Sequence, residues 1–598
     1  MSAPIRHAEG PEGEKRATRS NRPGQAPKPD RVAPGAIRRK FSRGRKHPRG
    51  VVWYGLRSFW GHLRHLAASA IATEDIDSRD WMTPDEPREF MHRIAAALGG
   101  SRHGSTLADC VGRDVWIDYV ADTGDDVSVS RAVGRLIFSE YELPDPDGSA
   151  ESILAPRGDI LFFGGDTAYP VSTADEIRSR VVVPFNQVLV DRPRDRLRVL
   201  LGIPGNHDWY DGLDGFGRMF RRQAAPAGGS ATLHDSRRTR FGQYADFAKQ
   251  FVLGGHITKP RTLELVGYVP VQNASYFAFL VAPGIGLLAV DRQLKEIDSR
   301  QAHFFQGWLN NNLGISPWVA LPDPVYAFGE PSPSGTAMIE SLGLNPNARP
   351  HFVLSGDIHH YRREQHGPSL HVTAGGGGAF LHPAALGSEL APEVEWPDRP
   401  QSRALLASVP IRIALGRAGF IPHLVLALVF APSAAFLGSR QPRASDFIAA
   451  AVTAVLFTLT YAFLGGAREK PAVFGLAAVA GFSTAPLPYL VFHAARQIAR
   501  FAGLPPSKWM VAAVALAAAS CLGAFIFGAY LAALTFFGLE RTQAFTALDH
   551  PGFKHFVRLR VRADGSAIDG WCLGVVDPLS HDHGKPVLVD TFTWRPLR

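Results

Sequence analysis

The chain has 598 residues, of which 64 are Lys or Arg and 55 are Asp or Glu, so its formal charge is +9. This length exceeds what one ordinary hydrophobic core holds together, and several domains are therefore expected. The three cysteines, Cys110, Cys521 and Cys572, lie far apart in no paired spacing, which argues against a disulfide framework or a thiolate metal site and is typical of a reducing compartment.

The positive charge is concentrated in residues 1–50, which hold 14 Lys and Arg and 4 Asp and Glu, while the rest of the chain holds 50 and 51. This segment is rich in Pro, Gly and Arg and has almost no large apolar residues, so we expect a disordered basic tail. It lacks the apolar stretch of a secretory signal. Such a tail could bind anionic lipid headgroups, with nucleic acid the weaker expectation, or it could bind nothing specific.

Residues 51–112 are expected to form a helical lead-in. In residues 51–72 (VVWYGLRSFWGHLRHLAASAIA), aromatic and aliphatic residues recur at helical spacing with basic residues between them, which predicts an amphipathic helix. Its apolar stripe could lie on a membrane surface or pack against the next domain. A second helix is predicted to begin at Thr83, which can cap it, with Pro84 in the first turn and Glu86 completing a capping box.

Residues 113–390 have the pattern of an α/β domain. Short apolar runs end in Gly, Asp or His, and helix-length connections such as residues 172–190 separate them. The runs are VWIDYVA, DILFFGGD, LRVLLGIPGNHD, YFAFLVA, IGLLAVD and HFVLSGDIHH. Strands that end in ionisable residues predict a functional site at one edge of the sheets.

After a linker at residues 391–418, residues 419–538 contain four apolar stretches, near 419–438, 446–466, 472–493 and 510–538, each about long enough to cross a bilayer ~30 Å thick. Their Ala, Gly, Ser and Thr residues suit close helix packing in lipid, so we expect four transmembrane helices, the third weakened by Pro486 and Pro488. Ten Lys and Arg flank these stretches on the side of the α/β domain and five on the other side. This asymmetry favours an integral, multi-pass membrane protein with a cytoplasmic catalytic domain.

Residues 539–598 are expected to form a C-terminal β-rich segment. Alternating residues on both sides of Asp564 and Gly565 predict a β-hairpin. From the sequence, this hairpin could join the sheet of the α/β domain or stand apart.

Four segments place chemically active side chains directly after apolar runs: ADTGD (121–125), GGDTAY (164–169), GNHD (205–208) and SGDIHHY (355–361). If the strands lie side by side, these side chains meet at one edge of the sheet. They offer oxygen and imidazole donors without thiolates, a set that suits hard metal ions. Two such ions lower the pKa of a shared water and clamp the oxygens of a displacement at phosphorus, so we expect phosphoester or phosphoanhydride hydrolysis. The candidate residues are Asp122, Asp166, Tyr169, Asn206, His207, Asp357 and His359.

The order Asp-x-Gly, Gly-Asp-x-x-Tyr, Gly-Asn-His-Asp and Gly-x-x-His resembles the calcineurin-like metallophosphoesterase superfamily, and the first three blocks are most similar to its purple-acid-phosphatase variant. The resemblance covers about residues 113–380 and implies a four-layer α/β sandwich, in which two mixed β-sheets are flanked by helices, with two metal ions at its site. It makes Asp166 the carboxylate that bridges the ions. It assigns Asp122, Tyr169 and His359 to one ion and Asn206 to the other, and it gives His207, oriented by Asp208, contact with the phosphate and the leaving oxygen.

Two departures from the family pattern concern the second ion. The family usually ends in Gly-His-x-His, whereas GDIH puts Asp357 where the first His would bind, and residues 318–330 (WVALPDPVYAFGE) lack an expected His. His256 or His303 could supply the missing donor. Manganese, magnesium or calcium would suit this half better than zinc, iron is a further candidate for the pair, or one ion could be absent at rest.

Two further features leave alternatives open. Tyr169 could be an ordinary packed aromatic instead of a ligand, and the four consecutive glycines at 375–378 could either bring backbone close to the metals or form a simple turn. The expected function is a membrane-anchored phosphoesterase that hydrolyses a phosphomonoester, phosphodiester or pyrophosphate, with a lipid-linked substrate among the candidates. The alternative is a catalytically degenerate phosphoesterase fold that serves as a membrane-bound nucleotide or protein binding module.

Overall fold

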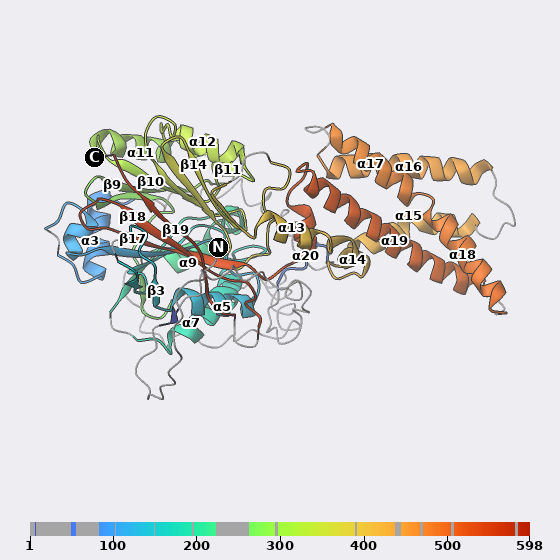
Figure 1. Ribbon diagram of the computed structural model, residues 1–598, viewed down its shortest axis with the longest axis horizontal. Helices are drawn as coiled ribbons and strands as arrows, with labels where there is room; N and C mark the ends of the chain where they lie inside the picture. The colour runs from blue at the N-terminus through green and yellow to red at the C-terminus, as the bar shows by residue number, and fades with distance from the viewer. Residues whose placement is uncertain are drawn as a thin grey trace, which may run out of the picture.

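The computed structural model describes residues 6–7, 50–55, 83–101, 103–148, 150–193, 196–222, 262–293, 297–388, 392–436, 444–466, 471–503, 508–580 and 584–597. These residues form an α/β body and an arm of long helices that extends from one side of it (Figure 1). The expected amphipathic helix falls largely on residues outside this description, as do His256 and most of the basic tail. Within the tail, Arg6–His7 forms a short strand, β1, paired with Tyr141–Leu143.

One seven-stranded sheet has the order β19-β18-β17-β2-β5-β6-β7. Its parallel part comprises β2 (Val115–Val120), β5 (Ile160–Phe163), β6 (Arg198–Gly202) and β7 (Tyr268–Pro270). Its antiparallel part comprises β17 (Lys554–Val561), β18 (Ile568–Val575) and β19 (Val587–Trp594). Because the parallel strands run in one direction, their carboxyl ends lie at one edge of the sheet.

The second seven-stranded sheet has the order β16-β14-β15-β13-β10-β9-β8. Its strands are β8 (Phe277–Ala282), β9 (Ile285–Ala289), β10 (Ser316–Leu321), β13 (Phe352–Ser355), β14 (Tyr361–His366), β15 (Ser369–Ala374) and β16 (Val394–Trp396). The strands β9, β10, β13 and β15 are parallel neighbours, and antiparallel pairs continue the sheet on both sides. The small pairs β3 (Tyr141–Leu143) with β4 (Ile153–Ala155), and β11 (Tyr326–Ala327) with β12 (Glu330–Pro331), lie outside both large sheets.

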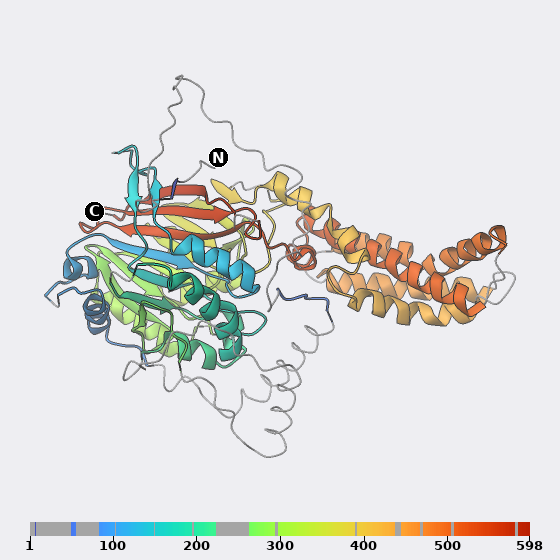
Figure 2. The same ribbon diagram turned by 90° about the horizontal axis from the view of Figure 1, so that it is seen from below.

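The two large sheets pack face to face because alternate residues of their strands point into a shared core that includes Phe162, Phe277, Trp318 and Phe352. The other face of the first sheet is covered by α5 (Val127–Ile137), α6 (Ala174–Ile177), the π-helix η2 (Arg178–Val182), α7 (Val183–Leu189) and α9 (Asp214–Phe220). The other face of the second sheet is covered by α11 (Ser299–Asn311) and α12 (Pro333–Ser341). An α/β fold with two mixed sheets flanked by helices is therefore confirmed (Figure 2).

Two short helices cover one end of the shared core, and the first begins later than predicted. The helix α3 (Pro87–Ala97) is capped by Glu86, whose side chain accepts a hydrogen bond from the Glu89 amide, so it begins four residues after the predicted cap Thr83. Asp85 precedes the helix, and its Oδ2 lies 2.9 Å from Nη1 of Arg93 within the helix. The helix α4 (Leu107–Val111) follows with a Thr106 capping box.

The helical arm consists of α15 (Ile421–Phe436), α16 (Ala444–Leu464), α17 (Ala472–Thr484), α18 (Leu487–Phe501) and α19 (Lys508–Phe536). Within the described residues, Ala472–Phe501 and Trp509–Phe536 are long and apolar enough to cross a membrane, and Ile421–Pro432 and Ile448–Leu464 are shorter apolar helices. The third predicted stretch is interrupted at Pro486, where α17 gives way to α18. The short helices α13 (Arg399–Leu406), α14 (Val409–Ala414) and α20 (Gln543–Leu548) lie at the base of the arm (Figure 1).

The C-terminal segment returns from the arm to complete the first sheet. The predicted hairpin is formed by β17 and β18, and β17 pairs directly with β2, which answers the question left open by the sequence. The guanidinium of Arg558 and the carboxylate of Asp118 form a buried ion pair across this junction, with Nε 2.6 Å from Oδ1. The helical arm is thus inserted into the α/β body, whose sheet is built from both sides of the insertion.

Candidate functional site

The candidate site is a small cavity where the carboxyl ends of strands from the two sheets meet. Asp122 follows β2, Asp166 follows β5 and Asn206 follows β6, while the second sheet contributes Asp323 after β10 and Asp357 after β13. All five line one cavity, together with Gly164, Gly165, Gly205 and Pro322. Four predicted residues that are distant in the chain, Asp122, Asp166, Asn206 and Asp357, are therefore brought together.

The backbone turns sharply at three of these carboxylates. Asp122, Asp166 and Asp357 have φ angles of 57°, 48° and 64°, in the left-handed region that residues other than glycine rarely adopt. A non-glycine residue in this region costs about 1–3 kcal/mol and is found most often at functional sites. An Asp in the same left-handed backbone conformation therefore follows each of the strands β2, β5 and β13.

The first half of the site consists of Asp122, Asp166, Tyr169 and His359, and the Tyr169 hydroxyl lies at its centre. Its oxygen is 2.8 Å from Oδ1 of Asp122, 3.1 Å from Oδ2 of Asp166 and 3.0 Å from Nε2 of His359. The tyrosine is buried, and its ring also lies 4.4 Å from the His207 ring. Tyr169 therefore contacts three predicted site residues through its oxygen in addition to packing through its ring.

The contacts of His359 define where its proton lies. Its Nδ1 is 2.7 Å from the carbonyl oxygen of Phe380, which can only accept, so Nδ1 carries the proton. Burial, reinforced by the charge of Lys554, lowers the pKa of His359 well below its usual value, so the ring is neutral and Nε2 presents a lone pair. Two carboxylate oxygens and this nitrogen consequently face the Tyr169 hydroxyl, which has only one proton to donate.

The carboxylates of the site are costly to ionise without a cation. Burial raises the pKa of Asp122 to about 7, although hydrogen bonds from Tyr169 and from the Asp357 amide oppose this shift. Burial raises the pKa of Asp166 and of Asp357 well above the usual range, and neighbouring carboxylates add to both shifts, Asp122 for the former and Asp323 for the latter. A bound cation would remove this cost because it favours the ionised form of each ligand.

Asn206, His207 and Asp208 open the short helix α8 (Asn206–Trp209), which begins after a short turn that follows β6. The His207 amide donates to Oδ1 of Asp166 at 2.8 Å, which ties this turn to the neighbouring strand. The His207 ring is oriented by the Pro170 carbonyl oxygen, 2.7 Å from Nδ1, and not by Asp208 as expected. Asp208 instead accepts from the amides of Gly205 and Thr167, because a buried carboxylate beneath a tight turn satisfies the amides that the turn exposes.

The second half of the site contains two residues that the sequence analysis missed. Asp323 follows β10 inside residues 318–330, the stretch that lacks an expected His, and it lines the cavity beside Asp357. The guanidinium of Arg292 is 2.5 Å from Oδ1 of Asp323, and the hydroxyl of Ser334 donates to Oδ2 at 2.7 Å. The sequence does contain a signal for Asp323, since it follows an apolar run as the other site carboxylates do, but the family pattern predicts a histidine in this stretch and not a carboxylate.

The glycine run at 375–378 packs against the site. A Cβ on Gly375 would lie 2.6 Å from Oδ2 of Asp122, and the amides of Gly377 and Ala379 donate to the carbonyl oxygens of Ala121 and Asp122. The run therefore brings backbone within contact of the Asp122 carboxylate, and a side chain at 375 would collide with it.

The donor set fits a metal ion in the first half of the site. Among the described residues, no group of three His, Cys, Asp or Glu side chains is arranged to hold an ion by itself, so a site here would depend on the Tyr169 oxygen as well. Donor atoms bound side by side to one ion at 2.0–2.2 Å lie about 3 Å apart. The separations of 2.8, 3.1, 3.0 and 3.3 Å among Asp122, Asp166, Tyr169 and His359 match that spacing.

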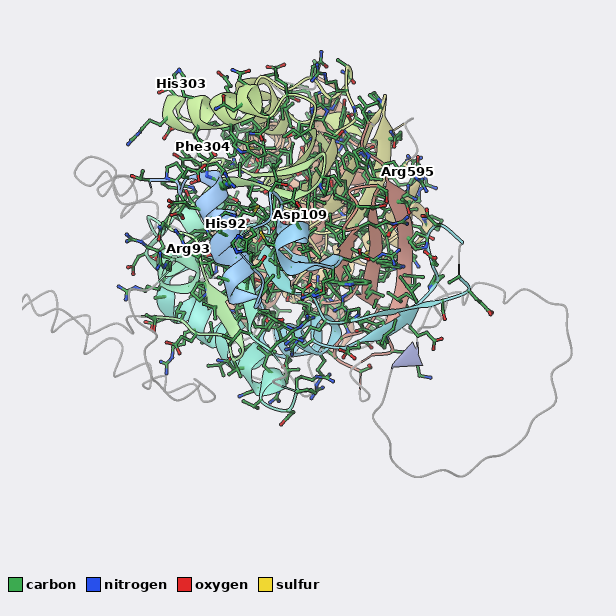
Figure 3. All side chains as sticks on the ribbon, turned by 90° about the vertical axis from the view of Figure 1, so that its left-hand side faces the viewer. His92, Arg93, Asp109, His303, Phe304 and Arg595 are labelled. Atoms are coloured by element: carbon green, nitrogen blue, oxygen red, sulfur yellow. The ribbon has the colours of Figure 1, made fainter. Side chains whose placement is uncertain are left out.

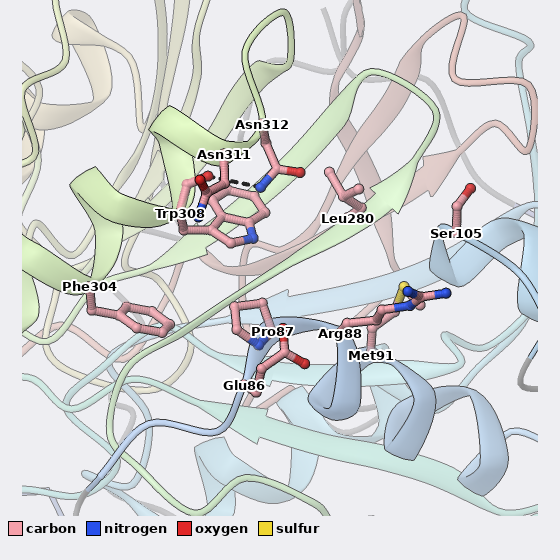
Figure 4. Close-up of a pocket in the computed structure, with 10 residues that line it drawn as sticks. All are labelled: Glu86, Pro87, Arg88, Met91, Ser105, Leu280, Phe304, Trp308, Asn311 and Asn312. Carbon is pink, nitrogen blue, oxygen red and sulfur yellow. Dashed lines mark hydrogen bonds between the residues drawn. The ribbon is translucent and has the colours of Figure 1, made fainter.

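Two other features lie apart from this site. His303, a candidate for the missing donor, is exposed on α11 with its Nδ1 2.6 Å from the Ser299 carbonyl oxygen, on the face of the body turned away from the arm (Figure 3). A separate cavity of about 340 Å³ is lined by Phe304 and Trp308 of α11 and by Pro87 and Met91 of α3, all labelled in Figure 4. Neither place contains any of the residues that line the candidate site.

Comparisons with known proteins identify no family. No family model matches the chain, and no curated protein matches it. A solved structure described as "GAP50 the anchor in the inner membrane complex of Plasmodium" matches with a TM-score of 0.29 and 10% identity over 47% of this chain and 78% of that chain. A likeness this weak adds nothing to the case for a fold or a function, which depends on the residues described above.

Proposed function

We propose that the protein is a metal-dependent phosphoester hydrolase with a calcineurin-like metallophosphoesterase fold. The observation that supports this most is the convergence of Asp122, Asp166 and the lone pair of His359 on the single proton of Tyr169. Such an excess of acceptors in a buried site is stable when a cation is present. The donor types and the order of the motifs along the chain favour a phosphate ester as the substrate.

Asp122, Tyr169 and His359 would hold one ion, Asp166 would bridge, and Asn206 and Asp357 would face the second position, with iron, manganese, zinc, magnesium and calcium as candidates. A bound ion supplies the acidity that makes water a nucleophile at neutral pH and the charge that stabilises a phosphoryl transition state. His207 has its Nδ1 held by the Pro170 carbonyl oxygen, so its Nε2 is the atom that accepts or delivers a proton at the substrate. Asp208 shapes the turn that carries His207.

We further propose that the arm anchors this enzyme in a membrane by four crossings, with the body in the cytoplasm. Large apolar side chains are exposed on helices of the arm, for example Phe463 at 75% and Val479 at 67%, which is unusual for a surface in water. The site is linked to the base of the arm by Trp53 and Tyr54. The Trp53 ring lies 6.3 Å from the His207 ring, and the Tyr54 ring lies 6.3 Å from that of Phe527 in α19. This proximity favours a lipid-linked phosphate or pyrophosphate as the substrate.

The test is a hydrolysis screen of full-length, detergent-solubilised protein with phosphomonoesters, phosphodiesters and nucleotide pyrophosphates, each free and lipid-linked, in each candidate metal. We expect turnover of at least one class, and Asp166→Asn should lower it by at least ~100-fold, since even residues that only support metal ligands cost 10–100-fold when changed. The matched control is Asp564→Asn in the exposed β17–β18 turn, which should retain full activity. No turnover in any metal, with the substrates still bound, would favour the degenerate binding module instead.

A further inference from the structure

The second half of the candidate site already contains a fixed cation. Arg292 lies three residues after β9, and its Nη1 is 2.5 Å from Oδ1 of Asp323. Arg292 is largely buried, and burial alone would lower the pKa of its guanidinium, but the carboxylates of Asp323, Asp357 and Asp166 raise it on balance. The guanidinium is therefore charged, is paired with Asp323 and lies within electrostatic reach of Asp357 and Asp166.

The two halves of the site differ in which groups balance the negative charge of their carboxylates. In the first half, Asp122 and Asp166 face the hydroxyl of Tyr169 and the neutral ring of His359, and none of these contacts is an ion pair with Lys or Arg. In the second half, both oxygens of Asp323 are already engaged, one by Arg292 and the other by Ser334. An ion at this second position would have to displace a largely buried ion pair and lie next to a guanidinium that cannot lose its proton.

Resting on the proposed function, we infer that Arg292 takes the place of the second metal ion, so that the protein binds one divalent ion tightly, through Asp122, Asp166, Tyr169 and His359. Asp357, which stands where the family has a histidine, and Asp323 both fit this role, because carboxylates pair with arginine as readily as with a metal. Arg292 is thus a positioning residue that determines how many ions the site accepts.

The test is the number of Mn²⁺ ions that metal-free, full-length protein in detergent binds, measured by equilibrium dialysis and elemental analysis without substrate. We expect one tightly bound ion per chain in the natural protein and in Arg292→Lys, which keeps the positive charge. In Arg292→Gln, Asp323 loses its ion pair and the positive charge near Asp357 is removed, so we expect a second ion to bind at least tenfold more tightly than it does in the natural protein. The matched control is Arg93→Gln, which removes an arginine of similar burial that pairs with Asp85 on the far face of the body and should leave one ion bound (Figure 3).

Two tightly bound ions in the natural protein would overturn the inference and leave the proposed function standing. An unchanged single ion in folded Arg292→Gln would overturn it as well, because the second position would then be closed by something other than Arg292. If thermal unfolding shows that Arg292→Gln does not fold, the stoichiometry of the natural protein decides by itself. No bound ion in the natural protein would overturn both the inference and the proposed function.

Discussion

At the scale of single residues, the site is defined by the contacts of one hydroxyl. Tyr169 lies within 3.1 Å of two carboxylates and an imidazole, and the fixed tautomer of His359 makes that imidazole an acceptor. These four residues were predicted as site residues from their positions after apolar runs. Their common contact with one hydroxyl could not be predicted, because it depends on side-chain positions set by two different sheets.

Replacing Tyr169 by Phe should weaken metal binding without unfolding the protein. The variant keeps the buried ring against His207 and removes only the oxygen that approaches Asp122, Asp166 and His359. We expect the affinity for Mn²⁺ to fall about 10–100-fold, the range found for groups that support metal ligands. The measurement is the dissociation constant by equilibrium dialysis, and an unchanged value would mean that Tyr169 only packs.

The glycine run provides a second prediction at this scale. In Gly375→Ala, the added methyl group would lie 2.6 Å from Asp122 Oδ2 and 2.5 Å from the Ile358 carbonyl oxygen, so we expect a loss of about 1–3 kcal/mol in stability and weaker metal binding. Gly307→Ala is the control, because that helical glycine has nothing within 4 Å of the added group and should gain about 0.5–1 kcal/mol. Denaturation of both variants in detergent checks the opposite signs, and equal effects would contradict the close approach.

At the scale of elements, strand β15 contains a buried histidine that makes stability depend on pH. Burial, with His366 and His351 nearby and Glu364 opposing, lowers the pKa of His371 to about 3. The unfolded chain takes up this proton near pH 6.5, whereas the folded protein does not until about pH 3. The contribution of the neutral His371 to the free energy of unfolding is therefore fully present above about pH 6.5, and it is lost progressively as the pH falls between these two values.

The variant His371→Gln should reduce this acid sensitivity. One such group costs about 1.4 kcal/mol per pH unit, so between pH 7 and pH 5 the natural protein should lose about 2 kcal/mol more than the variant. The free energy of unfolding, measured by denaturant titration at both pH values, checks this difference. Parallel pH profiles for the two proteins would show that His371 titrates normally in the folded state.

At the scale of the whole molecule, the α/β body is built from two parts of the chain that the helical arm separates. The Arg558 guanidinium on β17 contacts Asp118 on β2 and also donates to the carbonyl oxygens of Ser139, Ala155 and Ile137. Removing one partner of such a buried pair leaves an uncompensated charge. The C-terminal strands are therefore part of the fold that positions Asp122, which lies two residues after the end of β2.

Replacing Arg558 by Leu should destabilise the whole body. We expect a loss of about 3–5 kcal/mol, because Asp118 would be left buried without its countercharge. The control is Arg595→Leu, which removes the arginine labelled in Figure 3. Its side chain is 63% exposed and paired with Asp147, so the expected loss is at most about 1 kcal/mol. Thermal unfolding of both variants in detergent measures the difference, and equal losses would mean that the junction of β17 with β2 is not critical.

The sequence by itself determined the local features. It predicted the strands that precede Asp122, Asp166, Asn206 and Asp357, the C-terminal hairpin and the apolar stretches, because each depends on a pattern within a few residues. It misplaced the start of α3, where Glu86 caps the helix in place of Thr83, since several nearby residues could serve as the cap.

Only the tertiary structure decided which distant residues meet. In the folded protein, Asp323 and Arg292 lie at the site, and β17 pairs with β2 in the first sheet. The ring of His207 is oriented by a contact with the Pro170 carbonyl oxygen and not by Asp208. None of these contacts has a signature in local periodicity, because each joins residues from different strands or loops whose approach depends on how the two sheets pack. The types of donor atom at the site could therefore be predicted from the sequence. The number of donors that meet there, and the charges that balance them, depend on how the two sheets pack.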